Sequence, residues 1–179
     1  MLRSLEAWIT ACESEPDPLL TDCVRLFATP LGPHHSRAVF AFTRDDASLR
    51  QSAGLPEFDS PSEVRAWVKW QRHARGATVS ALVEPQEHGP IGAITLTDDG
   101  YFSYWIGTPH QRKGYGRLAL QLLVQLASRR RVGRLHSYVE SGNDASRRAL
   151  AASGFVLVGG GDSGWTGQLE YSMEVAYAI

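Results

Sequence analysis

The sequence contains little of what builds disulfide-bonded, metal-binding or membrane-spanning proteins. Its 179 residues include two cysteines, Cys12 and Cys23, without a C-x-x-C pair or a neighbouring histidine. We expect two reduced, semi-buried thiols, because nothing supports a zinc or redox site. No stretch approaches the roughly 18–20 consecutive apolar residues of a membrane span, and the N-terminal MLRSLEAWITACES lacks a signal-peptide core. We therefore expect a cytoplasmic protein with no membrane partner.

A strong excess of charge of one sign is also absent. Lys and Arg number 18 and Asp and Glu number 19, and the net charge of −1 argues against a general nucleic-acid binder. The charges are nevertheless unevenly distributed, because residues 112–148 carry +7 and the remainder carries −8. A basic segment in an acidic protein favours a localised anionic ligand such as a phosphorylated cofactor. For Arg129–Arg131 and Arg134, a solvated helix end is the alternative.

The composition is that of an ordinary folded domain with a short appendage. Hydrophobic residues make up 43% of the chain and charged residues 21%. Residues 1–34 are assigned to an N-terminal helical extension or an elaborated first unit, because apolar residues recur there at helical spacing as far as Phe27, before Pro30 and Pro33. Residues 35–179 are assigned to the main domain.

Hydrophobic periodicity predicts a mixture of strands and helices along the main domain. Strands are expected at residues 38–43, 77–83, 91–97, 101–106, 135–140, 155–158 and 169–176. Helices are expected at residues 45–51, 60–73, 114–130 and 143–153. This order predicts an α/β or α+β fold, with a sheet that carries helices on both faces.

The segment that carries chemistry is YWIGTPHQRKGYG, residues 104–116. A strand ends at Gly107, and Gly114 and Gly116 remove side chains at the start of a long helix, where consecutive amides are exposed. Such a nest of amides binds phosphate, and Arg112 and Lys113 add positive charge. The spacing fits neither a P-loop nor a dinucleotide-binding fingerprint. The residues by themselves leave open a pyrophosphate loop and an ordinary strand-to-helix turn.

Residues Gln111–Gly116, QRKGYG, resemble the Q/R-x-x-G-x-G/A acyl-CoA signature of the GNAT superfamily of N-acetyltransferases. SYWIGTPHQRKGYGRLALQLLVQLA resembles the fourth strand and third helix of that fold. NDASRRALAASGF resembles the following helix, with the N-x-x-S…GF pattern of the ribosomal-protein-alanine (Rim-type) branch. The resemblance covers residues 36–179 and is strongest over 101–158. It implies a mixed, mostly antiparallel sheet of six to seven strands flanked by helices and splayed between strands 4 and 5, where the pantetheine of acetyl-CoA inserts.

The resemblance also implies how individual residues hold acetyl-CoA. Backbone groups of Ile106 and Thr108 pair with pantetheine amides, and an amide near Ile106 steadies the thioester oxyanion. Asn143, the only asparagine in the chain, caps its helix and approaches pantetheine. The implied cofactor-binding set is Ile106, Gly107, Thr108, Gln111, Arg112, Lys113, Gly114, Tyr115, Gly116, Asn143 and Ser146.

The implied reaction is attack of an amine on the acetyl thioester. The ammonium must lose a proton, and the leaving thiolate, whose thiol has a pKa near 8.5, gains from a proton donor. The resemblance gives the donor role to Ser146; many relatives use a tyrosine one turn later, where this chain has Leu150. Without the resemblance, Ser146 is a first-turn residue that bonds its own backbone. Glu84 and Glu140 lead as candidates for the general base. The other candidates are Glu87, Tyr138 and Glu170.

The expected function is acetyl transfer from acetyl-CoA to a primary amine, either a protein N-terminal α-amine or a small-molecule amine, in a ternary complex. The alternative is a non-catalytic acyl-CoA-binding sensor or interaction module with the same fold. No nucleic-acid partner is expected, a homodimer is compatible with the aromatic residues in loops, and the pair His34 and His35 falls short of the ligands that a metal site needs. Acidic residues near the first loop suit a cationic acceptor: Asp45, Asp46, Glu57 and Asp59.

Overall fold

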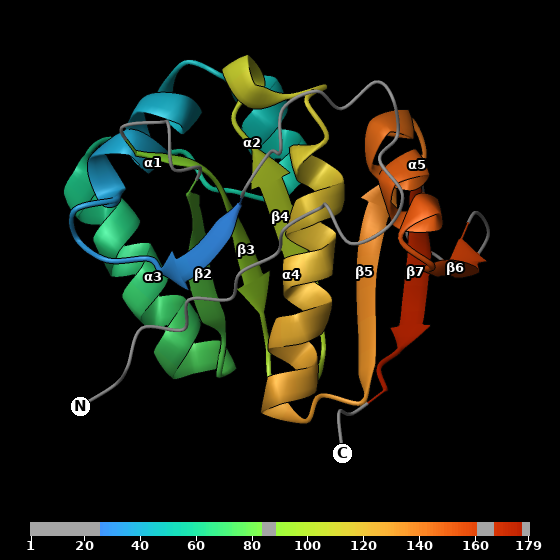
Figure 1. Ribbon diagram of the computed structural model, residues 1–179. Helices are drawn as coiled ribbons and strands as arrows, with labels where there is room; N and C mark the ends of the chain where they lie inside the picture. The colour runs from blue at the N-terminus through green and yellow to red at the C-terminus, as the bar shows by residue number, and fades with distance from the viewer. Residues whose placement is uncertain (1–25, 84–88, 161–166, 177–179) are drawn as a thin grey trace.

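The computed structural model describes residues 26–83, 89–160 and 167–176, which form seven strands and five α-helices (Figure 1). The N-terminal half contains β1 (Phe27–Pro30), α1 (Ser36–Arg44), α2 (Ala47–Ala53), α3 (Pro61–Arg75), β2 (Thr78–Val83), β3 (Pro90–Leu96) and β4 (Phe102–Ile106). The C-terminal half contains the 3-10 helix η1 (Thr108–His110), α4 (Tyr115–Arg130), β5 (Arg134–Glu140), α5 (Asp144–Ala152), β6 (Val156–Gly160) and β7 (Gln168–Glu174).

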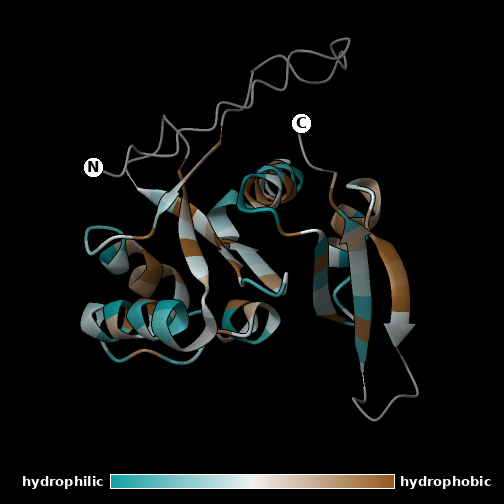
Figure 2. Cartoon of the chain, turned by 90° about the horizontal axis from the view of Figure 1, so that it is seen from below, coloured by the Kyte–Doolittle hydropathy of each residue, from teal (hydrophilic) through white to brown (hydrophobic). Residues whose placement is uncertain are grey.

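The strands form two antiparallel sheets, in the orders β1-β2-β3-β4 and β5-β7-β6. Within the described residues, β4 and β5 meet only at one end, where Tyr101 and His136 form an isolated parallel bridge and the His136 amide donates to Gly100 O at 3.0 Å. Beyond that bridge the two strands diverge. The predicted sheet, splayed between strands 4 and 5, is confirmed, and Figure 2 shows the two sheets apart.

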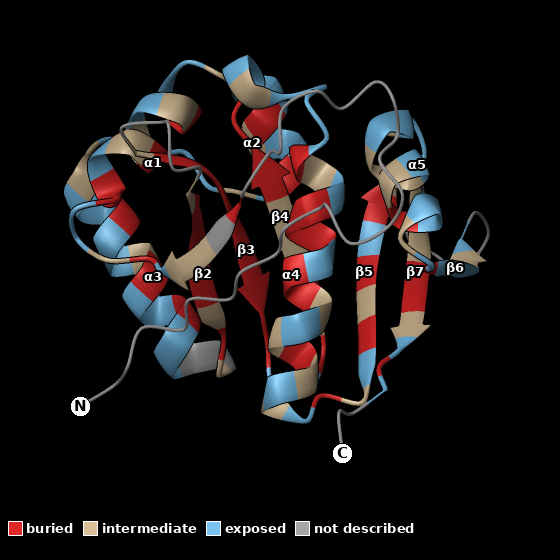
Figure 3. Cartoon of the chain, viewed as in Figure 1, coloured by how far each residue is buried: buried red, intermediate tan, exposed pale blue. Residues whose placement is uncertain are grey.

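Helices cover both faces of the first sheet, and strand alternation divides the side chains between them. On one face, α1 and α3 bury Val39 and Val64 against Trp105 of β4. On the other face, α4 packs against Phe102 and Ile106 of the same strand, and its core continues into the second sheet. Figure 3 shows β3 buried along its whole length at the centre. Helix α4 contacts both sheets, and its first turn lies beside Tyr104 of β4, next to the split.

Two sequence predictions are corrected by the structure. Residues 38–43 belong to helix α1 and are not a strand: Ser36, Val39 and Thr43 form its buried face at helical spacing. A short apolar run such as AVFAFT fits a buried strand and a buried helix equally well, so periodicity could not separate them. Phe27 belongs to β1, which pairs with β2, and not to a helix. Residues 1–25 lie outside the described residues, and the domain division at residue 34 stays a prediction.

Among the described helices, none is long and apolar enough to cross a membrane. The described residues also contain no group of three or more His, Cys, Asp or Glu side chains that could hold a metal ion.

Candidate active site

The loop between β4 and α4 is shaped by two left-handed residues. Arg112 has φ +62° and Gly114 has φ +83°. Alternation of right-handed and left-handed residues turns successive amides to one side of the chain and forms a concave anion site. Gly114 is also the N-cap of α4 and provides no side-chain cap. The helix therefore begins without the hydrogen bond that usually satisfies its first amides.

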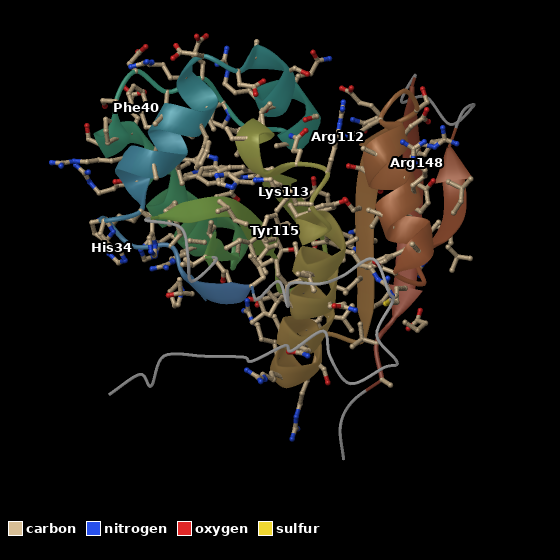
Figure 4. All side chains as sticks on the ribbon, turned by 45° about the horizontal axis from the view of Figure 1, so that its top comes forward. His34, Phe40, Arg112, Lys113, Tyr115 and Arg148 are labelled. Atoms are coloured by element: carbon tan, nitrogen blue, oxygen red, sulfur yellow. The ribbon has the colours of Figure 1, made fainter. Side chains whose placement is uncertain are left out.

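The amides of this loop lack acceptors within the described part of the chain. Those of Arg112, Lys113, Gly114 and Gly116 donate no hydrogen bond to a described residue. They lie at the N-terminal, positive end of a 16-residue helix. Figure 4 shows Arg112 and Lys113 at this end of α4 and Arg148 on α5 across the separation of the sheets. Uncapped amides, the helix dipole and exposed cations are the features that favour an anion such as phosphate at a helix N-terminus.

The ladder between β3 and β4 directs the backbone of Ile106 toward the second sheet. Ile106 lies opposite Gly92, and the next residue, Gly107, donates its amide to Ile91 O at 2.8 Å. In an antiparallel ladder, hydrogen-bonded and non-bonded pairs alternate, so the amide and carbonyl of Ile106 point away from β3. The carbonyl accepts a hydrogen bond from Gln111 Nε2 at 2.9 Å. The amide of Ile106 thus faces the edge where β4 and β5 separate.

Two neighbours of Ile106 anchor the loop to the N-terminal helices. A Cβ on Gly107 would lie 2.7 Å from Cδ1 of Phe42, so a larger residue would displace this ring of α1. The Thr108 hydroxyl donates to Asp46 Oδ2, and Asp46 caps α2 by accepting the Leu49 amide at 2.8 Å. The hydrogen bond from Thr108, followed by that from Leu49, lowers the pKa of Asp46. The cofactor loop is therefore fixed to both α1 and α2.

On the other side of the split, α5 provides two polar residues. Asn143 Oδ1 accepts the Ser146 amide at 3.1 Å, which confirms the predicted helix cap. Ser146 and Tyr104, which comes from β4, line the same cavity across the split. Burial raises the pKa of Tyr104, and the neighbouring Ser146 hydroxyl offsets part of this rise. A Cβ on Gly116 would lie 3.8 Å from Cε2 of Tyr104, so the ring also lies beside the first turn of α4.

A cavity of about 660 Å³ occupies the split. It extends from Tyr104, Asn143 and Ser146 past β4 and β5 to the end of α2. Three carboxylates line it, and its described lining contains neither lysine nor arginine. The lining residues are Gln51, Ser52, Ala53, Gly54, Asp99, Tyr101, Ser103, Tyr104, His136, Ser137, Tyr138, Val139, Glu140, Asn143, Ser146, Gly160, Gln168 and Glu170.

The carboxylates of the cavity are Asp99, Glu140 and Glu170. A hydrogen bond from the Thr97 hydroxyl lowers the pKa of Asp99, so this group is ionised at neutral pH. Glu140 accepts a hydrogen bond from Gln51 Nε2 at 3.4 Å. No ion pair joins the three carboxylates to a lysine or arginine among the described residues. This side of the split is negatively charged, whereas the cofactor loop is positively charged.

Of the predicted site residues, Glu140, Asn143 and Ser146 line the cavity in the split, and the others that the structure describes lie at the end of β4 and in the loop that leads to α4. Tyr115 is the exception within the loop, because its side chain is buried in the core beside α4 and only its backbone faces the loop. Glu84 and Glu87 lie outside the described residues. Sequence reasoning missed Tyr104 and Asp99. Alternation along β4 was the available signal for Tyr104, since it places residues 104 and 106 on one face.

These features define first a class of protein: one with a split sheet, a basic loop suited to an anion on one side and an acidic cavity on the other. A family model described as "Acetyltransferase (GNAT) domain" matches residues 25–156. The chain belongs to this GNAT acetyltransferase family. Family membership makes it an acetyl-CoA-dependent acetyltransferase, as the sequence resemblance implies. A search of curated proteins found no match.

Solved structures with related folds agree with the family assignment. Spermidine N-acetyltransferase from Vibrio cholerae, in complex with CoA and spermine, is 14% identical, with 84% of this chain and 95% of that chain covered and a TM-score of 0.71. An acetyltransferase from Salmonella typhimurium that modifies the N-terminal serine of a ribosomal subunit protein is 19% identical, with 86% and 95% covered and a TM-score of 0.67. At these identities the likeness shows the fold.

Proposed function

We propose that the protein transfers the acetyl group of acetyl-CoA to a primary amine by direct attack in a ternary complex. The observation that carries this proposal is the cavity at the β4–β5 split, which adjoins the basic loop of α4 through Tyr104 and continues to an acidic lining. An acylated polyanion and a cationic acceptor would thus approach the same point from oppositely charged sides. Electrostatic attraction favours both approaches.

On the cofactor side, the amides from Arg112 to Gly116 hold the pyrophosphate, and Arg112 and Lys113 neutralise its charge. Backbone groups on the free edge of β4, together with Asn143, would hold the pantetheine. Gly107 and Thr108 fix this edge through their contacts with Phe42 and Asp46. The Ile106 amide, which faces the split, donates to the thioester oxygen as that atom becomes an oxyanion.

The chemical step needs a base for the ammonium and an acid for the thiolate. Glu140, on the cavity wall, accepts the ammonium proton through a water molecule. The amine nitrogen then forms a bond to the acetyl carbon, the C–S bond breaks, and the electron pair leaves with sulfur. Ser146 donates its proton to that sulfur and regains one from solvent. Glu84 stays the other candidate for the base.

The acceptor that suits the lining best is a small amine with a second positive charge. Asp99, Glu140 and Glu170 supply carboxylates for two ammonium groups, and the described lining would repel neither. The spermine-bound neighbour supports this choice. The neighbour that modifies an N-terminal serine supports the other acceptor, a protein α-amine. A panel that contains spermidine and a short peptide with a free N-terminal alanine separates the two acceptors.

The first prediction tests the cofactor site by titration calorimetry with acetyl-CoA. Wild-type protein should bind acetyl-CoA with micromolar affinity, and Gly114→Glu should abolish binding, because its carboxylate would occupy the pyrophosphate site. Gly167→Glu is the matched control: Gly167 also has a positive φ, +95°, with open space around it, but lies in the turn just before β7. This control should bind like wild type.

Two results would contradict the proposal. Folded wild-type protein that fails to bind acetyl-CoA, or a Gly114→Glu variant that binds normally, removes the cofactor site. Binding followed by no thiol release with any amine in the panel favours the non-catalytic sensor.

A further inference from the structure

Two tyrosine rings with no role in the steps above meet in the cavity at the split. Tyr101 lies just before β4 and Tyr138 lies on β5, so the two rings come from opposite sides of the split. Their centroids are 6.4 Å apart, and the ring planes are stacked at 30°. The ring of His136 joins them, 5.9 Å from that of Tyr101 and tilted by 60°. All three residues line the cavity.

Core packing does not account for the position of Tyr138. Side chains alternate along β5, so that Leu135 and Val139 belong to the hydrophobic core, whereas Tyr138 is 49% exposed. Its exposed surface lies within the cavity. Aromatic surface inside a cavity is a common feature of ligand sites, because a bound molecule removes it from water. The stacked tyrosines therefore present a face that a ligand can cover.

Carboxylates flank the two rings. Glu170 of β7 lies directly opposite Tyr138 in the ladder, so the two side chains share one face of the sheet. Asp99 Oδ1 accepts the Tyr101 amide at 3.4 Å and a hydrogen bond from the Thr97 hydroxyl, which fixes this carboxylate beside Tyr101. The face of an aromatic ring attracts cations, as a carboxylate does. Rings and carboxylates thus favour the same ligand group, an ammonium.

The strand sets the distance between these rings and the expected site of reaction. Glu140, the proposed base, follows Tyr138 by two residues on the same face of β5, which corresponds to about 7 Å along the strand. An amine that loses its proton near Glu140 cannot place the same nitrogen over Tyr138. A cation bound over Tyr138 is therefore a second nitrogen of the acceptor, several methylene groups from the first.

We propose that Tyr138, stacked on Tyr101, is a specificity-determining residue that binds the distal ammonium of a linear diamine or polyamine. This inference rests on the proposed function and names the feature by which the cavity selects its acceptor. The near ammonium loses its proton and attacks the acetyl carbon. The distal nitrogen keeps its proton and forms no covalent bond. Its charge lies over the ring of Tyr138, where Asp99 and Glu170 add to the attraction.

Two substrates of equal length isolate the distal charge. 1,4-Diaminobutane and butylamine share a four-carbon chain, and only the diamine carries a second ammonium. Wild-type kcat/KM for thiol release from acetyl-CoA should be at least about 10-fold higher for the diamine. Tyr138→Leu removes the aromatic face but keeps apolar bulk. It should lower kcat/KM for the diamine roughly 5- to 30-fold and change that for butylamine less than about twofold. Tyr138→Phe keeps the ring and should keep the preference.

Trp70→Leu is the matched control. Trp70 is also an exposed aromatic residue, but it lies on α3 and outside the cavity lining. Its replacement should leave the preference for the diamine unchanged. The calorimetric affinity of Tyr138→Leu for acetyl-CoA should match that of the wild type, because Tyr138 lies outside the cofactor loop.

The outcomes separate this inference from the proposed function. An undiminished preference in Tyr138→Leu, or an equal loss for both amines, overturns the distal site. Wild-type protein that acetylates both amines equally, or acetylates only the peptide with a free N-terminal alanine, overturns the distal site and leaves acetyl transfer to an amine intact. Folded wild-type protein that releases thiol with neither amines nor peptide overturns both.

Discussion

At the scale of single residues, Arg112 adopts a backbone conformation that an L-residue with a side chain rarely takes. Its φ of +62° costs about 1–2 kcal/mol for a residue other than glycine. Such strain is retained where the surrounding structure requires it, and it concentrates at functional sites. Here the conformation turns the loop amides to one side and presents a cation at the same position. Strain at Arg112 is therefore consistent with the anion site.

His35 leads to a prediction about stability and pH. It is buried, and its Nδ1 accepts the Gly32 amide at 3.2 Å, which requires a neutral ring. Burial, with a smaller contribution from His34, lowers the pKa of His35 from its ordinary value of 6.5. The unfolded state therefore binds this proton more readily than the folded state. The contribution of His35 to stability should be complete above about pH 6.5 and lost as the pH falls through the lower folded value.

Denaturant unfolding at about pH 5.5 and about pH 7.5 measures this effect. The wild type should have the lower free energy of unfolding at the acidic pH. His35→Asn retains an acceptor for the Gly32 amide but does not titrate, so its decrease should be smaller. An unchanged pH dependence in this variant would assign the effect to other groups.

At the scale of elements, the stability of α5 depends on its N-cap residue, Asn143. Asn143 accepts the Ser146 amide and so both caps the helix and fixes the backbone of Ser146. Asn143→Ala should lower the free energy of unfolding by about 1 kcal/mol, because the cap is lost. Asn143→Asp, which keeps an acceptor oxygen at the same position, should retain most of the stability. Chemical denaturation checks both values, and equal losses in the two variants would show that the cap contributes little.

At the scale of the whole molecule, the two sheets share one layer of helices but little strand pairing. The amides of Tyr104 and Ile106 face the split, whereas that of Trp105 belongs to the ladder with β3. CoA bound along the edge of β4 should therefore slow hydrogen exchange at Tyr104 and Ile106 more than at Trp105. NMR-detected exchange with and without CoA measures this difference, and equal slowing at all three amides would argue against binding at this edge.

Ligand binding should also stabilise the molecule as a whole. CoA at about 100 times its dissociation constant adds about 2.7 kcal/mol to the free energy of unfolding of a protein that binds it only when folded. In Gly114→Glu this increment should disappear together with the exchange effect.

The sequence by itself determined the order of elements from β2 onward, the glycine-containing loop before α4 and the Asn143 cap. Each depends on residues close together in the chain: strand and helix periodicity, the glycines that begin α4, and a side-chain oxygen three residues before the amide that it accepts. Local chemistry decides such features. The family signature lies within one of these segments, which explains why the class of enzyme could be predicted.

The tertiary structure alone decided the features that join distant segments. Whether residues 38–43 form a strand or a helix depended on burial against α3 and not on the spacing of their hydrophobic residues. Tyr104 of β4 and Ser146 of α5 line one cavity only because the two sheets pack on either side of the split. The acidic lining combines side chains from the β3–β4 turn, β5 and β7. No local pattern records these contacts, because they arise only when separate elements pack together.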